Sequence, residues 1–250
     1  MKKILITGPR SGIGKFLAKK LKNGNNSLYL LNRSNFEKIK KIKFDFIVHC
    51  AGKRPIFNSK NKIYDYYIDN IKLTEKITNL SFKKIIYFST VDVYENSSLV
   101  KKENIKININ NLKGIYPLTK LISESIIANK SQNYLIIRLP TLIGKTMRIT
   151  SLYNILKKKN SFVPYSKNII FNLVDYNTVY EIIIYWFKHN VKGIFNVASK
   201  KNIKMSSLIK KSKYYGKNNY DVGNISIAKI NKIKKSFLEN SIDVFNRHKA

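Results

Sequence analysis

The chain has 250 residues, 44% of them hydrophobic, which is enough to bury the core of one domain, alone or with a small appendage. Its single cysteine, Cys50, excludes an internal disulfide and predicts a reducing compartment, the cytoplasm. No signal peptide is expected, and the longest apolar run, residues 182–187, is too short to span a bilayer.

The formal net charge of +34 comes from 48 Lys and Arg residues, only six of which are Arg. Such an excess has two interpretations. One is binding to nucleic acid or to a membrane surface, and the other is compositional drift. We favour drift because the lysines are dispersed along the chain. Nucleic acid is therefore not an expected partner, although the charge should attract anionic substrates.

Apolar runs alternate with helical patterns along the chain, which is typical of βα units around a parallel sheet. The fold class is therefore α/β, with a doubly wound parallel sheet. The predicted strands are residues 4–7, 28–31, 46–50, 85–89, 134–139 and 194–197, and the predicted helices are residues 15–22, 64–80, 117–129 and 178–189.

The first predicted strand runs into a glycine-rich turn that opens a helix. Three of the ten glycines of the chain, Gly8, Gly12 and Gly14, fall within residues 8–14 of this turn. Glycine lets the backbone approach a pyrophosphate closely, and the helix N-terminus offers unpaired N–H groups to the anion. The alternative is a glycine turn that binds no ligand. We expect the turn to bind a dinucleotide through Gly8, Arg10, Ser11, Gly12, Ile13 and Gly14.

These patterns predict the domain organisation. Residues 1–147 are expected to form a dinucleotide-binding Rossmann domain, and residues 148–250 a small substrate lobe. About residues 170–198 of the second part are expected to return to the Rossmann core. The segment 32–43 has room for one brief helix, so a further strand that such sheets often have here is expected to be absent.

Tyr116 and Lys120 lie four residues apart, which places them on one face of a helix. Pro117 is acceptable only in the first helical turn, so the helix should begin there. A nearby ammonium group is expected to lower the pKa of the tyrosine, so that it can pass a proton to or from a substrate hydroxyl. A second such pair, Tyr153 and Lys157, matches by chance, whereas Tyr116 follows a strand that ends at the hydroxyl of Thr90.

The chain resembles the short-chain dehydrogenase/reductase superfamily, and within it the extended NAD(P)-dependent epimerases, dehydratases and reductases of nucleotide sugars. The resemblance covers nearly the whole chain. It is carried by the glycine turn, His49-Cys50-Ala51-Gly52, Asp69-Asn70-Ile71 with Thr74, Ser89-Thr90-Val91-Asp92-Val93-Tyr94, Tyr116 and Lys120 with Glu124, Arg138-Leu139-Pro140-Thr141 and Phe171-Asn172-Leu173-Val174-Asp175.

The resemblance implies a role for each matching residue. Tyr116 would be the acid/base, and Lys120 would hold the nicotinamide ribose. Thr90 would bind the reacting oxygen, and Asn70 would support the lysine. Ala51, Gly52 and Leu139 would contact the cofactor, and Asp92 and Thr141 would contact the substrate along with Thr90.

Three departures from the family pattern limit the assignment. The spacing of Gly8 and Gly12 matches the smaller single-domain subfamily. Glu95 replaces a glycine that usually follows Val93-Tyr94. Val91 stands where dehydratases carry the first of two adjacent acids, which argues against a dehydratase.

The stretch Asn32-Arg33-Ser34 after the second strand bears on the choice of cofactor. NAD-preferring relatives keep a carboxylate there, whereas this chain has none. Arg33 and Arg10 could instead grip the 2′-phosphate of NADP. We therefore expect NADP, with NAD as the alternative.

The expected function is that of an NADP-dependent oxidoreductase acting on a nucleotide-linked sugar or a related keto-sugar. A homodimer is one expected oligomeric state. One alternative is a nucleotide-sugar 4-epimerase that retains NAD. Another is a non-catalytic dinucleotide-binding regulator or RNA-binding relative. His49 is expected at a strand end near the cofactor rather than as a catalyst, and no Cys/His cluster predicts a metal.

Overall fold

Six parallel strands form the central sheet of the computed structural model, in the order β10-β5-β4-β3-β1-β2. The structure describes residues 1–22, 24–55, 62–95, 99–148, 151–157, 162–163, 166–208, 213–214, 216 and 220–249. All six predicted strands are confirmed, with ends that move by a few residues. They are β1 (Lys2–Thr7), β2 (Asn26–Leu31), β3 (Phe44–His49), β4 (Phe82–Thr90), β5 (Tyr134–Leu139) and β10 (Gly193–Asn196).

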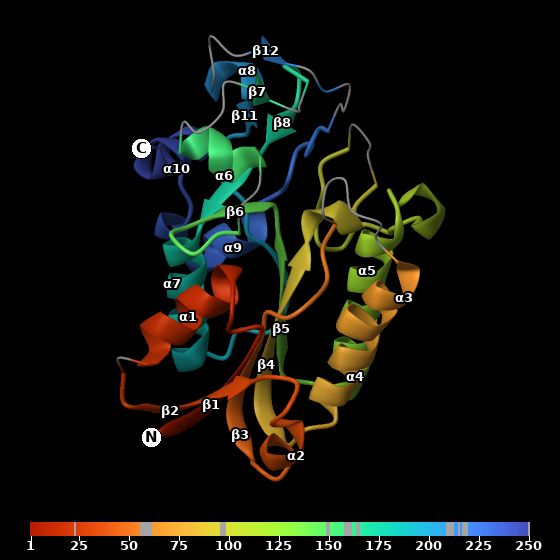
Figure 1. Cartoon of the computed structure of the whole chain (residues 1–250), viewed down its shortest axis with the longest axis vertical. Helices are drawn as coiled ribbons and strands as arrows, with labels where there is room; N and C mark the ends of the chain where they lie inside the picture. The colour runs from red at the N-terminus through yellow and green to blue at the C-terminus, as the bar shows by residue number, and fades with distance from the viewer. Residues whose placement is uncertain are drawn as a thin grey trace.

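Helices cover both faces of this sheet (Figure 1). On one face, α1 (Gly12–Lys22) and α7 (Tyr176–Lys188) pack on Ile4 and Ile6 of β1. On the other face, Leu5 of β1 packs with residues of α4 (Leu73–Thr78) and α5 (Ile115–Lys130). Successive side chains of a strand point to opposite faces, so a strand covered on both sides must be apolar throughout. The predicted doubly wound α/β fold is confirmed.

The strand order reverses between β1 and β3. Only the short helix α2 (Phe36–Ile39) connects β2 to β3, and β3 pairs with β1 rather than with β2. β2 is therefore an edge strand, which confirms that the segment between them is trimmed. Open α/β sheets bind ligands at such a reversal, outside the carboxyl ends of the strands.

The helix predicted for residues 64–80 forms with an interruption. It begins as α3 (Ile63–Tyr66), continues as the π-helical turn η1 (Tyr67–Lys72) and ends as α4. A π-helical turn inside an α-helix is rare and is often found at functional sites. Asn70, one of the predicted site residues, lies in this turn and is buried.

The C-terminal part adds three two-stranded sheets beyond the carboxyl ends of the central strands, in the upper part of Figure 1. β6 (Thr141–Ile143) pairs with β9 (Leu173–Asp175), β8 (Ile170–Phe171) with β11 (Ile203–Lys204), and β7 (Phe162–Val163) with β12 (Lys213–Tyr214). The remaining elements are η2 (Val91–Val93), η3 (Ile109–Asn111), α6 (Ser151–Leu156), α8 (Met205–Leu208), α9 (Ala228–Ile233), η4 (Lys235–Phe237) and α10 (Ser241–His248).

The residues after 199 contribute both to the core of the central sheet and to the core of the small C-terminal sheets. Ile230 and Phe237 pack into the main core against the face that α7 covers, whereas Val244 and Phe245 pack with the small sheets. This C-terminal segment therefore packs on the central sheet as well as within the predicted substrate lobe. The boundary at residues 147 and 148 stays a prediction.

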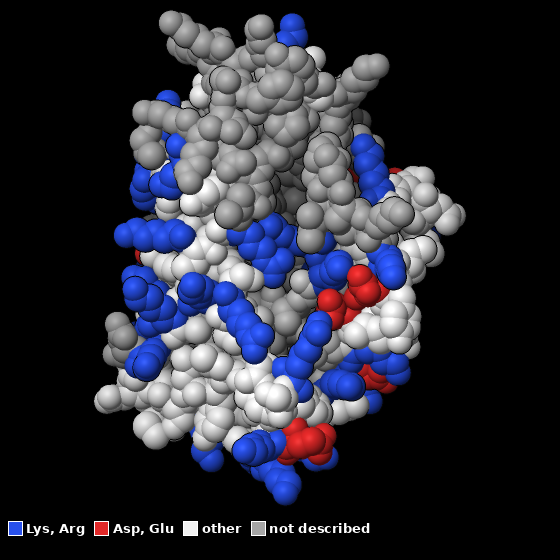
Figure 2. All heavy atoms as spheres, viewed as in Figure 1, with Lys and Arg blue, Asp and Glu red and all other residues white. Residues whose placement is uncertain are grey.

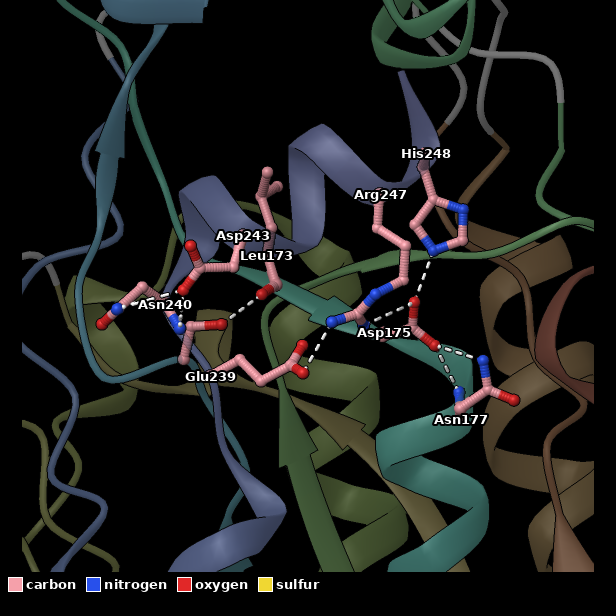
Figure 3. A network of polar contacts seen from close by, with 9 residues as sticks. Leu173, Asp175, Asn177, Glu239, Asn240, Asp243, Arg247 and His248 are labelled. Carbon is pink, nitrogen blue, oxygen red and sulfur yellow. Dashed lines mark hydrogen bonds and ion pairs between the residues drawn. The ribbon is translucent and has the colours of Figure 1, made fainter. Parts of the chain in front are cut away.

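A polar network joins α10 to the start of α7 (Figure 3). The buried carboxylate of Asp175 caps α7 by accepting a 2.6 Å hydrogen bond from the Asn177 N–H. Its second oxygen binds His248 Nε2 and lies 3.6 Å from Arg247 Nη1. The C-terminal helix is thus tied to the start of α7, whose first residue, Tyr176, lines the cavity described below. Among the described residues, no helix is long and apolar enough to cross a membrane.

Candidate active site

A cavity of about 1400 Å³ lies at the carboxyl ends of the central strands, below the small sheets. The turn after β1, the ends of β3 and β4, the first turns of α5 and parts of the C-terminal region line it. Its lining includes the predicted residues Gly8, Arg10, Ser11, Gly12, Ile13, Gly14, Asn32, Arg33, Ala51, Gly52, Thr90, Asp92, Tyr116, Lys120, Leu139 and Thr141. Two predicted residues, Ser34 and Asn70, do not belong to that lining.

The glycine-rich turn has the conformation that the sequence predicts for an anion site. Gly8 and Gly12 adopt φ values of +66° and +58°, which residues with a Cβ rarely adopt. A Cβ on Gly14 would lie 2.2 Å from the Gly8 carbonyl oxygen. A Cβ on Gly8 would lie 3.0 Å from the Ala51 Cα. Side chains are therefore excluded at Gly8 and Gly14, where the backbone itself forms the surface of the turn.

A segment after β6 lies against the same turn. The Gly12 N–H donates to the Thr146 carbonyl oxygen at 3.0 Å, and the Thr146 hydroxyl donates to the Gly12 carbonyl oxygen at 2.8 Å. Arg148 Nε donates to the Ser11 hydroxyl at 2.9 Å. The sequence analysis missed this contact, and no local pattern could have revealed it because the partners are more than 130 residues apart.

Tyr116 lies in the first turn of α5, which begins at Ile115, two residues before the predicted start. Burial raises the pKa of Tyr116, the negative charge of Asp92 raises it further, and Thr90 and Arg54 act in the opposite direction. The expectation of a lowered pKa at Tyr116 is therefore wrong for the protein alone. The physical reason is that loss of water around the phenol outweighs the nearby cations.

Lys120 is buried one helical turn beyond Tyr116. Its Nζ lies 4.1 Å from the centroid of the Tyr87 ring. Burial lowers the pKa of Lys120 to about 7, although the charge of Glu124 opposes this shift. This lysine can therefore gain or lose a proton near neutral pH, which an exposed lysine cannot do.

Glu124 belongs to a buried ion pair beneath the site. Arg138 Nη2 donates to Glu124 Oε2 at 2.6 Å, and the Ser89 hydroxyl also binds this carboxylate. Both charged side chains are less than 5% exposed. The pair joins α5 to β4 and β5, and so it fixes the helix that carries Tyr116 and Lys120.

His49 and Asn70 support the site from behind. His49 bridges the hydroxyls of Thr7 and Thr74 at 2.8 and 3.0 Å, and burial lowers its pKa to about 3. It is therefore a neutral structural residue, in agreement with its predicted place. The Asn70 amide binds the backbone of Lys53 and the Thr119 hydroxyl.

Gly52 lies between Asn70 and Lys120. A Cβ there would lie 2.9 Å from Asn70 Oδ1 and 3.9 Å from Lys120 Nζ. The absence of a side chain therefore leaves room for both groups beside the cavity.

Thr90 and Asp92 meet at the end of β4. The Thr90 hydroxyl donates to Asp92 Oδ2 at 3.0 Å. Tyr220, from the C-terminal part, donates to Asp92 Oδ1 at 2.8 Å and also lines the cavity. The sequence analysis did not single out Tyr220, because nothing in its surroundings marks it among 16 tyrosines.

Positive charge dominates the cavity. Among the described residues that line it, eight are Lys or Arg and two are Asp. Lys and Arg side chains gather around the hollow in the middle of the face seen in Figure 2. Arg10 and Arg33 both line the cavity, whereas Ser34 binds the Asn32 side chain in an exposed turn. No three His, Cys, Asp or Glu side chains of the described chain form a metal-binding group.

Solved structures with the same fold include several nucleotide-sugar enzymes. A dTDP-4-dehydrorhamnose reductase from Bacillus anthracis, in complex with NADP, superposes with a TM-score of 0.83 and 15% identity, over 99% of this chain and 98% of that chain. A UDP-glucuronic acid 4-epimerase from Bacillus cereus, in complex with UDP-glucuronic acid and NAD, gives a TM-score of 0.80 and 17% identity, over 99% and 97%. A dTDP-4-dehydrorhamnose reductase from Yersinia enterocolitica gives 0.80 and 18%, over 98% and 97%.

A search of curated protein sequences finds no match. The sequence model of the NAD dependent epimerase/dehydratase family matches residues 4–198, which include the glycine turn, Thr90, Tyr116 and Lys120. The predicted family resemblance is confirmed, and so is the expected nicotinamide dinucleotide cofactor as a class, without a choice between NAD and NADP. The chain therefore belongs to the NAD dependent epimerase/dehydratase family of enzymes.

Proposed function

We propose that this enzyme is an NADP-dependent oxidoreductase acting on a nucleotide-linked sugar or a related keto-sugar. The observation that carries the proposal is the placement of Thr90, Tyr116 and Lys120 in one cavity with the glycine-rich turn. A hydroxyl, a phenol and an ammonium group are sufficient to bind a reacting oxygen and to move a proton. A bound nicotinamide supplies the hydride, which no side chain can supply.

The residues present fit such a cofactor. The glycine turn leaves its backbone open to a pyrophosphate, and Arg10 lines the cavity beside it. Lys120 would hold the nicotinamide ribose, and Ala51, Gly52 and Leu139 would contact the rest of the nucleotide. Tyr116 would exchange a proton with the substrate oxygen, while Thr90, Asp92 and Thr141 would bind the sugar.

The preference for NADP rests on the end of β2. The turn Asn32-Arg33-Ser34 carries a cation and no carboxylate, so it suits a 2′-phosphate better than a ribose hydroxyl. The reductase from Bacillus anthracis, which shares the fold, is in complex with NADP. A preference for NADP supports net reduction of a keto-sugar. Retention of NAD would instead indicate the 4-epimerase alternative.

The positive charge of the cavity supports the proposal of an anionic substrate, such as a nucleoside diphosphate sugar. The similar structures are named for dTDP- and UDP-linked sugars, which supports this class without selecting a member. From the single cysteine we also propose a cytoplasmic location, and a homodimer stays a prediction.

Two steps test the proposal. Native purification followed by mass spectrometry identifies any cofactor that the protein carries. The protein is then assayed with dTDP-4-dehydrorhamnose and with UDP-linked keto-sugars, using NADPH or NADH. We expect turnover with NADPH, and we expect the dissociation constant of NADPH to be lower than that of NADH. Salt-sensitive binding of nucleic acid without any turnover would instead favour the non-catalytic alternative.

The cofactor preference is tested at Arg33. Arg33→Ala should weaken NADPH binding about tenfold or more and leave NADH binding unchanged, because a lost charged hydrogen bond weakens binding by that order. Lys38→Ala removes a nearby cation of α2 that does not line the cavity, and it should change neither. Equal binding of both cofactors, unaffected by Arg33→Ala, would show that the preference is wrong.

A further inference from the structure

Asp92 has both carboxylate oxygens engaged in the active-site cavity. Oδ2 accepts the hydrogen bond from Thr90, and Oδ1 accepts the one from Tyr220. The Asp92 backbone N–H also donates to the Thr90 hydroxyl oxygen at 3.2 Å. The carboxylate is therefore held between β4 and the C-terminal part, in a position that neither partner alone would fix.

These contacts determine what Thr90 can offer a substrate. A hydroxyl has one proton and two lone pairs. The proton of Thr90 is directed to Asp92, and one lone pair accepts from the Asp92 N–H. The remaining lone pair can accept a hydrogen bond but cannot donate one. A substrate carbonyl, which only accepts, must therefore take its hydrogen bond from a donor other than Thr90. Tyr116 forms a hydrogen bond with the Thr90 hydroxyl and can donate its proton to such a carbonyl instead.

The charge of Asp92 also acts on Tyr116. It raises the pKa of Tyr116 and that of Tyr220, in addition to the effect of burial on each. The other titratable or charged groups that face Tyr116 or Asp92 are Arg54, Tyr66, Tyr87, Lys101, Lys120 and Tyr220. Of these, Arg54 lowers the pKa of Tyr116 and Tyr66 raises it, so Asp92 is the one carboxylate acting on that phenol among these groups.

We propose that Asp92 is a positioning residue that keeps the proton on Tyr116 and turns the Thr90 proton away from the reacting oxygen, so that the site favours reduction of a carbonyl. The inference rests on the proposed function. In the step, the carbonyl carbon gains a hydride from the reduced cofactor and the carbonyl oxygen gains the Tyr116 proton. The products are an alcohol, the oxidised cofactor and a phenolate, which regains a proton from water.

The first test measures Tyr116 directly and needs no substrate. Protein labelled with carbon-13 at the tyrosine Cζ is titrated by NMR, and the Tyr116 resonance is assigned by its loss in Tyr116→Phe. In Asp92→Asn, the ionised fraction of Tyr116 at pH 11 should rise about tenfold, which corresponds to one pKa unit. An unchanged or smaller ionised fraction would overturn the proposal.

Two variants serve as controls in this titration. Asp221→Asn neutralises a carboxylate that raises the pKa of Tyr220 and is not among the main groups that shift the pKa of Tyr116. The new amide can still accept from the Gly223 N–H. Tyr220→Phe removes the hydrogen bond to Asp92 but keeps its charge. Neither should increase ionisation of Tyr116. An equal increase in the ionised fraction of Tyr116 in either variant would mean that the effect comes from a general change of structure and not from the charge of Asp92. That result would overturn the proposed role of Asp92.

The second test uses turnover of dTDP-4-dehydrorhamnose with NADPH. Lys120 loses its proton near pH 7, so a fall of kcat/KM at still higher pH is the one that reports Tyr116. That higher-pH fall should move down by about one unit in Asp92→Asn, because Tyr116 then loses its proton sooner. An unmoved alkaline limb in an active Asp92→Asn enzyme would overturn the inference alone. Absence of turnover in the wild-type enzyme would count against the proposed function, and the NMR titration would still decide the role of Asp92.

Discussion

Gly12, which lines the cavity, and Thr146 exchange two hydrogen bonds, although 134 residues separate them. The N–H of Gly12 belongs to the first turn of α1, where a helix normally offers unpaired donors to an anion. One of these donors is therefore already paired with the segment that follows β6. The glycine turn and the C-terminal part of the cavity are thus held in one relative position.

The contact predicts a cofactor-binding effect far from the glycines. Thr146→Val removes the hydroxyl that donates to Gly12, and such a bond is worth about 1 kcal/mol. The dissociation constant of NADPH should therefore rise about fivefold. Fluorescence titration with NADPH measures it. Thr78→Val, which removes a local bond to the Glu75 carbonyl in α4, should have no effect. Equal affinities in all three proteins would show that this contact does not shape the site.

Lys120→Met should separate the effect of this residue on folding from its proposed role in the reaction. Burial lowers the pKa of Lys120 to about 7 in the folded protein, below its value near 10.4 in an unfolded chain. Between these values the unfolded chain binds more protons, so wild-type stability rises with pH. The variant carries no such charge. It should therefore be more stable than wild type at pH 6, with a gain that shrinks toward pH 9.

Urea denaturation at the two pH values measures this difference. The same variant should lose turnover. A constant difference between pH 6 and pH 9 would mean that Lys120 does not titrate near neutral pH in the folded protein.

The buried pair of Arg138 and Glu124 predicts a large loss of stability. Arg138→Met leaves the Glu124 carboxylate buried without its cation, which costs about 3 to 5 kcal/mol. The double variant with Glu124→Leu should recover much of this loss, because it removes the unpaired charge as well. Chemical denaturation of the single and double variants tests this coupling. Additive losses would contradict it.

Asp175 predicts how stability changes in acid. Burial alone would raise its pKa, but the hydrogen bonds from His248 and the Asn177 N–H hold that pKa below its ordinary value. A carboxyl whose pKa is lowered by folding stabilises the protein above its unfolded value, near 3.9, and this contribution is lost as pH falls through the folded value. Asp175→Asn should therefore destabilise the protein at pH 7 by about 1 to 3 kcal/mol.

The difference between Asp175→Asn and wild type should begin to narrow below about pH 4, as the pH falls toward the lowered pKa of Asp175 in the folded protein. Thermal unfolding across this range measures it. A destabilisation that is as large at pH 3 as at pH 7 would mean that packing, rather than charge, explains the effect.

The strands of the central sheet could be predicted because each is buried on both faces and reads as an apolar run. The short segment between the second and third strands correctly indicated that no further strand forms there, which leaves β2 at the edge of the sheet. The start of α5 was predicted two residues late, because Pro117 is tolerated anywhere in the first turn. Local patterns therefore gave the strands of the central sheet and its main helices, with small errors at the ends, but not the small sheets of the C-terminal part.

The long-range contacts of the site could not be predicted in this way. Tyr220 meets Asp92 across 128 residues, and neither partner has a local signature. The direction of the Tyr116 pKa shift was wrong for a related reason. A four-residue spacing shows that a cation is near, but it does not show how much water the fold removes around the phenol.

The central claim is that Tyr116 moves the proton in a hydride-transfer reaction. The most direct measurement compares turnover of dTDP-4-dehydrorhamnose with NADPH in wild type, Tyr116→Phe and Tyr153→Phe. The second variant alters the other tyrosine that precedes a lysine by four residues and lies outside the cavity lining. We predict that Tyr116→Phe lowers kcat by about a hundredfold or more while binding NADPH normally, and that Tyr153→Phe behaves like wild type. Full turnover in Tyr116→Phe would contradict the claim.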